Sequence, residues 1–275
     1  MSNTNYRYSF ENKLAPHNKA ILQACRTGDL ARLIQLFQDH NTRPEPRASW
    51  REDPNGPPNT RILLDQAVVY QHAHIVRYLL SISPFEKKLA TKSTVRALVE
   101  TQNLEIAEVL RTRAPEIVNM ELGHFDTFLS AACRGGDGCN YDNLPGDDSL
   151  PLIHYLLDNG ADPSEGSWGG CGSIPAAIDF ARPLEVIDKM IEKGGVVNLL
   201  AFSSAVRNQR IDALQLFFDK APFSVSVDDM LKRAAESEDK EIMDIVERGA
   251  VKAGKRRYRR KSVWRRGLDA ILPVK

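Results

Sequence analysis

One short stretch of the chain, L-P-L-I-H-Y-L-L-D-N-G-A-D-P from Leu150 to Pro163, predicts an amphipathic helix that ends abruptly. Its apolar residues recur at helical spacing and share one face: Leu152, Ile153, Leu156 and Leu157. Gly160 favours the left-handed conformation that closes a helix, and the proline prevents the helix from continuing. A helix of about ten residues is not stable alone in water, so its apolar face must pack against neighbouring helices.

Degenerate copies of this unit recur along the chain. Each combines a helix with small residues, a tight turn, and a second helix rich in Leu, Ile or Val. The expected turn residues of the seven copies are Gly28, Gln71, Gln102, Gly135, Arg182, Gln209 and Glu238. Seven copies in register are much stronger evidence than one, and together they cover residues 18–250.

The repeated unit resembles the ankyrin repeat, whose consensus contains A-A-x-x-G-H-L-E-I-V-x-L-L-L-x-x-G-A-D. Leu150–Pro163 matches the second half of this consensus better than the other copies do. The opening T-P-L-H phrase of the family does not occur in the sequence. The resemblance implies an all-α fold, an ankyrin-like repeat solenoid of stacked antiparallel helix pairs.

The spacing of the turns predicts two long loop insertions. Successive turns lie 43, 31, 33, 47, 27 and 29 residues apart, whereas the family period is about 33. The two long intervals contain segments rich in proline or glycine, residues 41–59 and 136–149, which we expect to be surface loops. An N-terminal arm, residues 1–17, precedes the array, and a basic C-terminal tail with a short capping helix, residues 251–275, follows it.

Composition favours an intracellular protein. Hydrophobic residues make up 42% of the chain, enough for a continuous core, yet no apolar run has the length that crossing a bilayer requires. The first ten residues lack the apolar core of a secretory signal. We therefore expect a monomer in the cytoplasm, in the nucleus or in both, without membrane contact.

The four cysteines also fit a reducing compartment. Cys25 and Cys133 lie beside alanines in predicted helices and are expected to be small core residues. Cys139 and Cys171 fall in predicted loops, where free thiols are favoured over a disulfide or a metal-binding pair.

The formal net charge of +1 conceals a strong asymmetry. Nine Lys and Arg residues and no acid lie between positions 252 and 266, so the rest of the chain carries −8, which is +1 less +9. The densest cluster consists of Lys255, Arg256, Arg257, Arg259, Arg260 and Lys261. Unpaired charges of this density do not pack in a core, so the cluster is expected to be exposed, as in a nuclear-import or polyanion-binding patch.

An apolar stripe follows the basic cluster. Trp264, Leu268, Ile271 and Leu272 are spaced at i, i+4, i+7 and i+8, which is typical of one helix face. This stripe would cap the array while the basic face stays in water, so the structural and functional interpretations of the tail are compatible.

The sequence carries no recognisable catalytic or metal-binding motif. The glycine-rich residues 167–173 lack the Lys-Ser/Thr pair and the preceding strand of a phosphate-binding loop. The six histidines have no ligand spacing, and His72 instead fits the turn histidine of the family. We expect no catalytic residue, no cofactor, no metal and no enzymatic activity.

Two functions remain open. The favoured one is a protein-protein interaction module or scaffold that binds a partner on its concave repeat surface. By resemblance to the family, the residues expected to contact the partner are Gln71, Gln102, Trp168 and Gln209. The alternative is a nuclear nucleic-acid or chromatin-associated adaptor, in which the basic tail contacts a nucleic acid or an import receptor.

Alanine at Arg256, Arg257, Arg259 and Arg260 together should leave folding nearly intact, because exposed charges contribute little to stability. The same variant should lose nuclear accumulation or polyanion binding, measured by fluorescence microscopy and by retention on heparin. If localisation and heparin retention both stay unchanged, the tail is a structural cap.

Overall fold

The computed structural model describes residues 13–46, 54–83, 89–123, 126–135, 149–164 and 172–251. These residues are mostly helical, as the sequence predicts, and their named strands form a single antiparallel pair, β1 (Glu121–Gly123) and β2 (Asp126–Thr127). The helices are α2 (Pro16–Thr27), α3 (Leu30–Asp39), α4 (Thr60–Val69), α5 (Ala73–Ile82), α6 (Lys92–Thr101), α7 (Leu104–Arg113), the 3-10 helix η1 (Pro115–Asn119), α8 (Phe128–Arg134), α9 (Leu150–Asp158), α10 (Ser173–Asp179), α11 (Leu184–Glu192), α12 (Leu199–Arg207), α13 (Ile211–Lys220) and α14 (Val227–Glu236). Residues 240–251 are helical as well.

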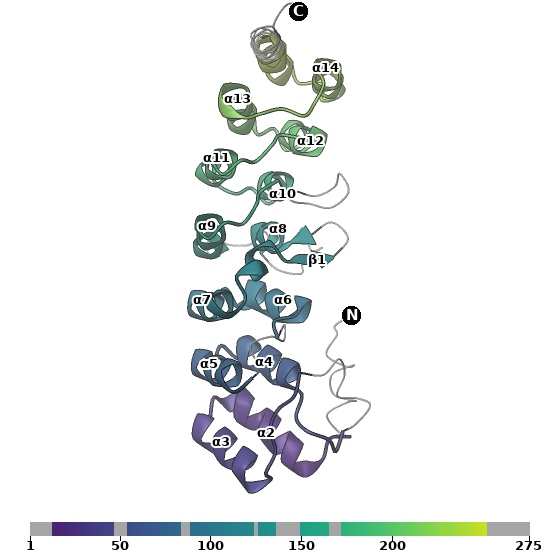
Figure 1. Ribbon diagram of the computed structural model, residues 1–275. Helices are drawn as coiled ribbons and strands as arrows, with labels where there is room; N and C mark the ends of the chain where they lie inside the picture. Colours follow the sequence, from purple (N-terminus) through teal and green to yellow (C-terminus); the bar gives the residue numbers. More distant parts are fainter. Residues whose placement is uncertain are drawn as a thin grey trace, which may run out of the picture.

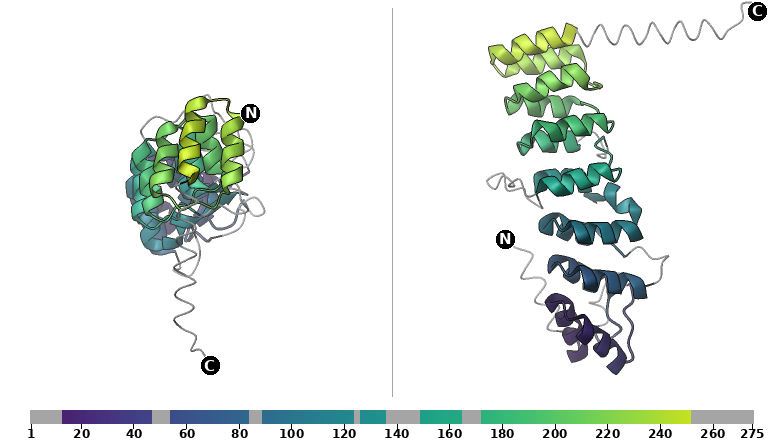
Figure 2. Two further views of the ribbon diagram at one scale, coloured as in Figure 1. Left: turned by 90° about the horizontal axis from the view of Figure 1, so that it is seen from above. Right: turned by 90° about the vertical axis from the view of Figure 1, so that its left-hand side faces the viewer.

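The helices lie in two columns along one axis (Figure 1). The even-numbered helices from α2 to α14 contact one another in chain order, and so do the odd-numbered helices from α5 to α13. The right-hand view of Figure 2 shows these odd-numbered helices one above another. We number the helix pairs from unit 1, α2 and α3, to unit 7, α14 and residues 240–251, and call the two members of a unit its first and second helix.

Five of the seven first helices begin with polar N-caps, and the other two, α2 and α10, follow Ala15 and Gly172. The side chains of Asn59, Asn198 and Ser226 accept hydrogen bonds from main-chain N–H groups of α4, α12 and α14. Thr91 and Thr127 form capping boxes at α6 and α8. These caps satisfy N–H groups that have no partner within the helix, so each helix starts locally although the chain lacks a common opening phrase.

Each first helix ends at a residue with positive φ. The seven residues and their φ angles are Gly28 (73°), Gln71 (60°), Gln102 (54°), Gly135 (76°), Ala181 (51°), Gln209 (51°) and Glu238 (57°). Six of them are the predicted turn residues. The prediction of Arg182 for unit 5 is wrong by one position.

Main-chain hydrogen bonds explain this correction. The N–H of Arg182 donates to the carbonyl of Ala177 at 2.8 Å, as the N–H of His72 does to Ala67. Arg182 therefore corresponds to His72, the residue after the turn. Pro183 is the N-cap of α11, so this helix begins at Leu184, three residues after its turn, whereas α3, α7 and α13 begin two residues after theirs.

One cluster of buried hydrophobic residues extends from Leu14 to Val246 and passes through all seven units. The predicted helix at residues 150–163 is α9, and its four predicted core residues, Leu152, Ile153, Leu156 and Leu157, are at most 1% exposed. This part of the sequence prediction is confirmed. Gly160 follows α9 with a φ of 87° and leads the chain into the next connection.

The ends of the first insertion, residues 41–46 and 54–59, are ordered against unit 1. Glu45 and Asn59 form an isolated parallel bridge. The fully buried Asn18 side chain donates to the carbonyls of Pro54 at 3.1 Å and Gly56 at 3.0 Å. Because α2 begins at Pro16, the N-terminal arm is slightly shorter than residues 1–17.

Several predicted segments lie outside the described residues. They are positions 47–53 of the first insertion, positions 136–148 of the second, and the tail from residue 252 onward. The last described residue of the second helix of unit 7 is Val251.

Leu156→Ala should lower the free energy of unfolding by about 2–5 kcal/mol, because the substitution leaves a cavity in the core. Leu156 is completely buried, whereas the control variant Leu104→Ala removes a side chain that is 37% exposed and should cost much less. Urea unfolding followed by circular dichroism measures both. Equal losses in the two variants would contradict the packing described here.

Candidate functional site

Hydrogen bonds join the turns of successive units along one edge of the stack, which we call the turn edge. His72 Nε2 lies 2.8 Å from the carbonyl oxygen of Arg26, and Arg182 Nε donates to the carbonyl of Cys133 at 2.8 Å. In both contacts the residue after one turn reaches the carbonyl two positions before the turn of the preceding unit. An imidazole and a guanidinium therefore perform the same task at equivalent positions.

Further contacts extend this row. His74 Nε2 lies 2.8 Å from the carbonyl oxygen of Gly28, and Arg210 donates to the carbonyl of Arg182 at 3.0 Å. A Cβ on Gly28 would lie 2.7 Å from His72 Nδ1, so the turn of unit 1 must be glycine for steric reasons as well as for its φ. Carbonyls at the end of a helix lack partners within it, and the next unit supplies them here.

The three predicted partner-binding glutamines all lie on the turn edge. Gln71 and Gln209 are exposed and Gln102 is partly exposed. Asn103 Nδ2 is 3.5 Å from Gln71 Oε1, which links neighbouring turns. Gln209 also lines a cavity of about 350 Å³ between units 6 and 7, beside Arg233 and Asp239.

The hydrogen bonds of the turn edge thus hold successive units together. The three glutamines are distributed along this edge, each at the end of a different first helix. Trp168, the fourth predicted contact residue, lies outside the described residues, as does the basic cluster.

The second helices are joined by ion pairs from one unit to the next. Arg77 on α5 pairs with Glu105 on α7 at 2.6 Å. Lys189 on α11 pairs with Asp158 on α9 at 2.8 Å, and hydrogen bonding to this ammonium lowers the pKa of Asp158. Lys220 on α13 pairs with Asp188 on α11 at 2.7 Å.

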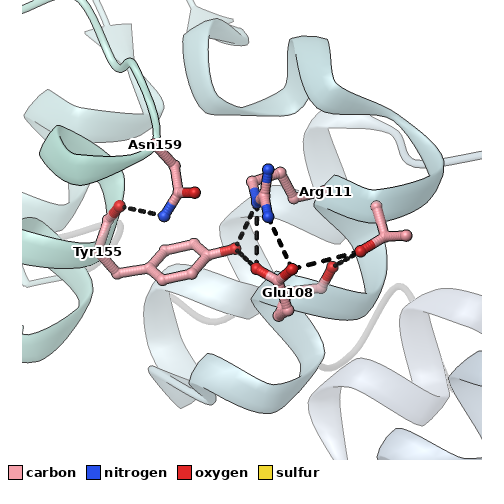
Figure 3. Close-up of polar contacts among 5 residues, drawn as sticks. Glu108, Arg111, Tyr155 and Asn159 are labelled. Atoms are coloured by element: carbon pink, nitrogen blue, oxygen red, sulfur yellow. Dashed lines mark hydrogen bonds and ion pairs between the residues drawn. The ribbon is translucent and has the colours of Figure 1, made fainter.

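A tyrosine completes this series between α7 and α9 (Figure 3). The hydroxyl of Tyr155 donates to Glu108 Oε2 at 2.7 Å and accepts from Arg111 Nε at 3.1 Å. Burial, together with the hydrogen bond to Glu108, raises the pKa of Tyr155 to about 12. Hydrogen bonds from Arg111 and then Tyr155 lower the pKa of Glu108. The hydroxyl stays protonated at neutral pH, so the cluster acts as a clamp between two units and not as a source of protons.

The opposite edge of the first helices, where the connections between units enter, exposes apolar side chains. Val196, Leu199 and Leu200 are 37%, 37% and 39% exposed, and we call these three residues the connection patch. Val196 belongs to the connection before α12, and the leucines are the first two residues of that helix. The connection is held in place by a parallel bridge between Val197 and Phe223.

A polar cavity of about 370 Å³ lies close in sequence to the connection patch. It is lined by residues of units 4 and 5, including Asp162, Ser164, Lys193 and Gly194. Ser164 Oγ donates to the carbonyl of Gly194 at 3.0 Å, so the wall of the cavity is tied to the connection that carries Val196. An apolar patch beside a polar cavity is a common composition for a protein-binding surface.

The described residues contain no group of three or more His, Cys, Asp or Glu that could hold a metal ion. Burial raises the pKa of both Cys25 and Cys133 to about 12, so these thiols are protonated and unreactive core groups. Within the same part of the chain, no helix combines the length and hydrophobicity needed to span a lipid bilayer.

Neither a protein-family model nor a curated protein sequence matches this chain.

Sequence reasoning missed both the connection patch and the role of Arg182. The run G-G-V-V-N-L-L, residues 194–200, offered a signal, because its apolar residues exceed what one buried helix face needs. For Arg182 the signal was weaker. An arginine at the position after the turn becomes informative only once the turn is placed at Ala181.

Gln209→Gly should raise the free energy of unfolding by about 1 kcal/mol, because glycine adopts the left-handed conformation without the steric cost of a Cβ. Gly28→Ala, its matched opposite, should destabilise through its φ of 73° and the clash with His72. Chemical denaturation measures both. Destabilisation by Gln209→Gly would show that the glutamine side chain makes a contact that stabilises the turn.

Proposed function

We propose that the chain is an ankyrin-like repeat protein, a solenoid of stacked helix pairs that acts as a non-enzymatic protein-protein interaction module or scaffold. Three observations support this proposal: seven left-handed turns at equivalent positions, the equivalent contacts of His72 and Arg182 along the turn edge, and helices that contact one another in chain order. Each unit touches its neighbours, which is the arrangement that repeat arrays use to present a long surface.

The connection patch is the observation that carries the proposed binding role. The position of Leu200, nine residues before the turn, is polar in units 1, 3, 4 and 7, where it holds Lys19, Ser93, Asp126 and Asp229. Packing of a first helix therefore does not require leucine at this position. Leu199 and Leu200 remain more than a third exposed, so their apolar surface is available to a partner.

The proposed partner is a protein segment that buries an apolar anchor on the connection patch and places polar groups in the neighbouring cavity. Burial of a leucine side chain contributes about 1.5–3 kcal/mol, so two leucines are enough to anchor a specific contact. This surface lies at the N-terminal ends of the first helices and not on the turn edge, so the proposal assigns binding to residues other than the three glutamines.

A second candidate function is a nuclear adaptor whose tail contacts nucleic acid. The nine positive charges between residues 252 and 266 favour it. Binding to phosphates weakens steeply as salt rises, whereas an apolar protein interface tolerates salt. The salt dependence of partner capture, measured for the full chain and for a chain that ends at Ala250, distinguishes the two functions.

The double variant Leu199→Asp/Leu200→Asp should weaken partner binding at least about tenfold, because the contact loses two apolar anchors. The matched control is Leu104→Asp. Like Leu199, Leu104 is the first residue of its helix and is 37% exposed, but it lies on a second helix. Proximity labelling in cells, followed by quantitative mass spectrometry, measures the partners of each variant.

Circular dichroism should show that all these proteins are folded. Proteins that the double variant loses and the control retains are the expected result. If the two variants lose the same proteins, or if neither loses any, the connection patch is not the binding surface.

A further inference from the structure

Three residues of unit 7 are more exposed than the residues that occupy the same positions, counted from the turn, in other units. Seven residues before the turn, units 1 to 6 have side chains that are at most 1% exposed: Ile21, Leu64, Val95, Phe128, Ile174 and Phe202. The equivalent residue of unit 7, Leu231, is only partly buried. Three residues before the turn, the six equivalents of Ala235 are buried, yet Ala235 is exposed.

The second helix of unit 7 shows the same asymmetry. Met243 is partly exposed, whereas Leu33, Val76 and Leu214, at the same distance after their turns, are completely buried. On its inner side this helix is tightly packed, because a Cβ on Gly249 would lie 2.3 Å from the ring of Phe218 on α13. Leu231 and Met243 contact the core cluster, yet Leu231, Ala235 and Met243 are all less buried than the equivalent residues of other units, and we call these three residues the terminal face.

The other end of the array is built differently. In unit 1, the position eight residues before the turn holds Ala20, which is partly buried, and the exposed residues of α2 include Lys19, Gln23 and Thr27. A small and polar outer surface is what the end of a repeat array needs to remain soluble. Unit 1 meets this requirement, but unit 7 presents a leucine and a methionine instead.

We propose that the terminal face is covered by the chain's own C-terminal tail, with the apolar stripe Trp264, Leu268, Ile271 and Leu272 packed on Leu231 and Met243. The stripe has helical spacing, and the terminal face lies where the first helix of an eighth unit would stack.

The length of the chain beyond Val251 fits this position. Six residues connect α11 to α12, and six connect α13 to α14. Twelve residues separate Val251 from Trp264, which is enough to make the same connection. In the preceding units each connection enters at the N-terminal end of the next first helix, so residues 252–263 would pass the N-terminal end of α14.

Charge complementarity between unit 7 and the C-terminal tail also supports docking of the tail on the terminal face. Asp228 and Asp229, in the first turn of α14, are both exposed. Seven of the nine positive charges of the tail lie between residues 252 and 261, within the connecting segment. Unit 7 from Val227 to Val251 contains eight acidic and four basic residues, a net charge of −4, so it attracts this segment.

The connection patch and the terminal face share no residue, so docking of the tail and binding of a partner do not depend on each other. Docking also bears on the basic cluster, which would lie against unit 7 in the docked tail and become fully accessible only when the tail is released.

The test uses the full chain with Trp50→Phe and Trp168→Phe, so that Trp264 is the single tryptophan. Docking predicts blue-shifted emission that is protected from iodide quenching. Leu231→Asp should shift the emission to that of exposed indole, and Asp228→Asn/Asp229→Asn should shift it partly. The matched control, Leu200→Asp, also places a charge on an exposed leucine of a first helix and should leave the emission unchanged.

A double-mutant cycle keeps the proposal testable if Leu231→Asp fails to fold. The unfolding equilibrium constant of the double variant Leu231→Ala/Trp264→Ala should differ by about fivefold or more from the value expected if the two single effects multiplied. For Leu200→Ala and Trp264→Ala the two effects should simply multiply. Solvent-like emission of Trp264 in the parent protein, or multiplicative effects in both cycles, would overturn the proposal. A blue shift that depends on protein concentration, together with a dimer in sedimentation that Leu231→Asp dissociates, would assign the face to a second copy and would also overturn it.

Discussion

The whole stack depends on one constraint, which is that helices of about ten residues cannot bury their own apolar faces. The first helix of each unit presents one row of apolar residues to the unit before it and another to the unit after it. Leu64, Phe128 and Phe202, each seven residues before the turn of its unit, are at most 1% exposed. Stability therefore depends on contacts between neighbouring helix pairs and not on single pairs.

Polar contacts between units then fix the register in which the apolar rows meet. On the turn edge, His72 and Arg182 reach equivalent carbonyls although their side chains differ in length and chemistry. On the second helices, Tyr155 reaches both Glu108 and Arg111, while neighbouring units use direct ion pairs. The side chain at this position can vary between units because different donors satisfy equivalent carbonyls.

Surfaces left over from stacking are where the chain has room for function. In the connection patch, Leu200 occupies a position that is polar in four other units. The packing of helices against one another therefore does not explain why an apolar residue is exposed there. The terminal face is only partly covered by the described residues, although the equivalent positions of other units are buried. We propose the first surface for an external partner and the second for an additional element of the same chain.

The sequence alone determined the helical fold, six of the seven turn positions and the core residues of α9, because apolar periodicity and helix-ending residues are local signals. It misplaced the turn of unit 5 at Arg182, because the pattern of α11 begins one residue later than in the other units and only main-chain hydrogen bonds reveal Ala181. Only the tertiary structure decided that Leu200 is exposed while Phe202, two residues further on, is completely buried. Both are apolar, and whether each is covered depends on the position of the neighbouring helices, which a local pattern does not encode.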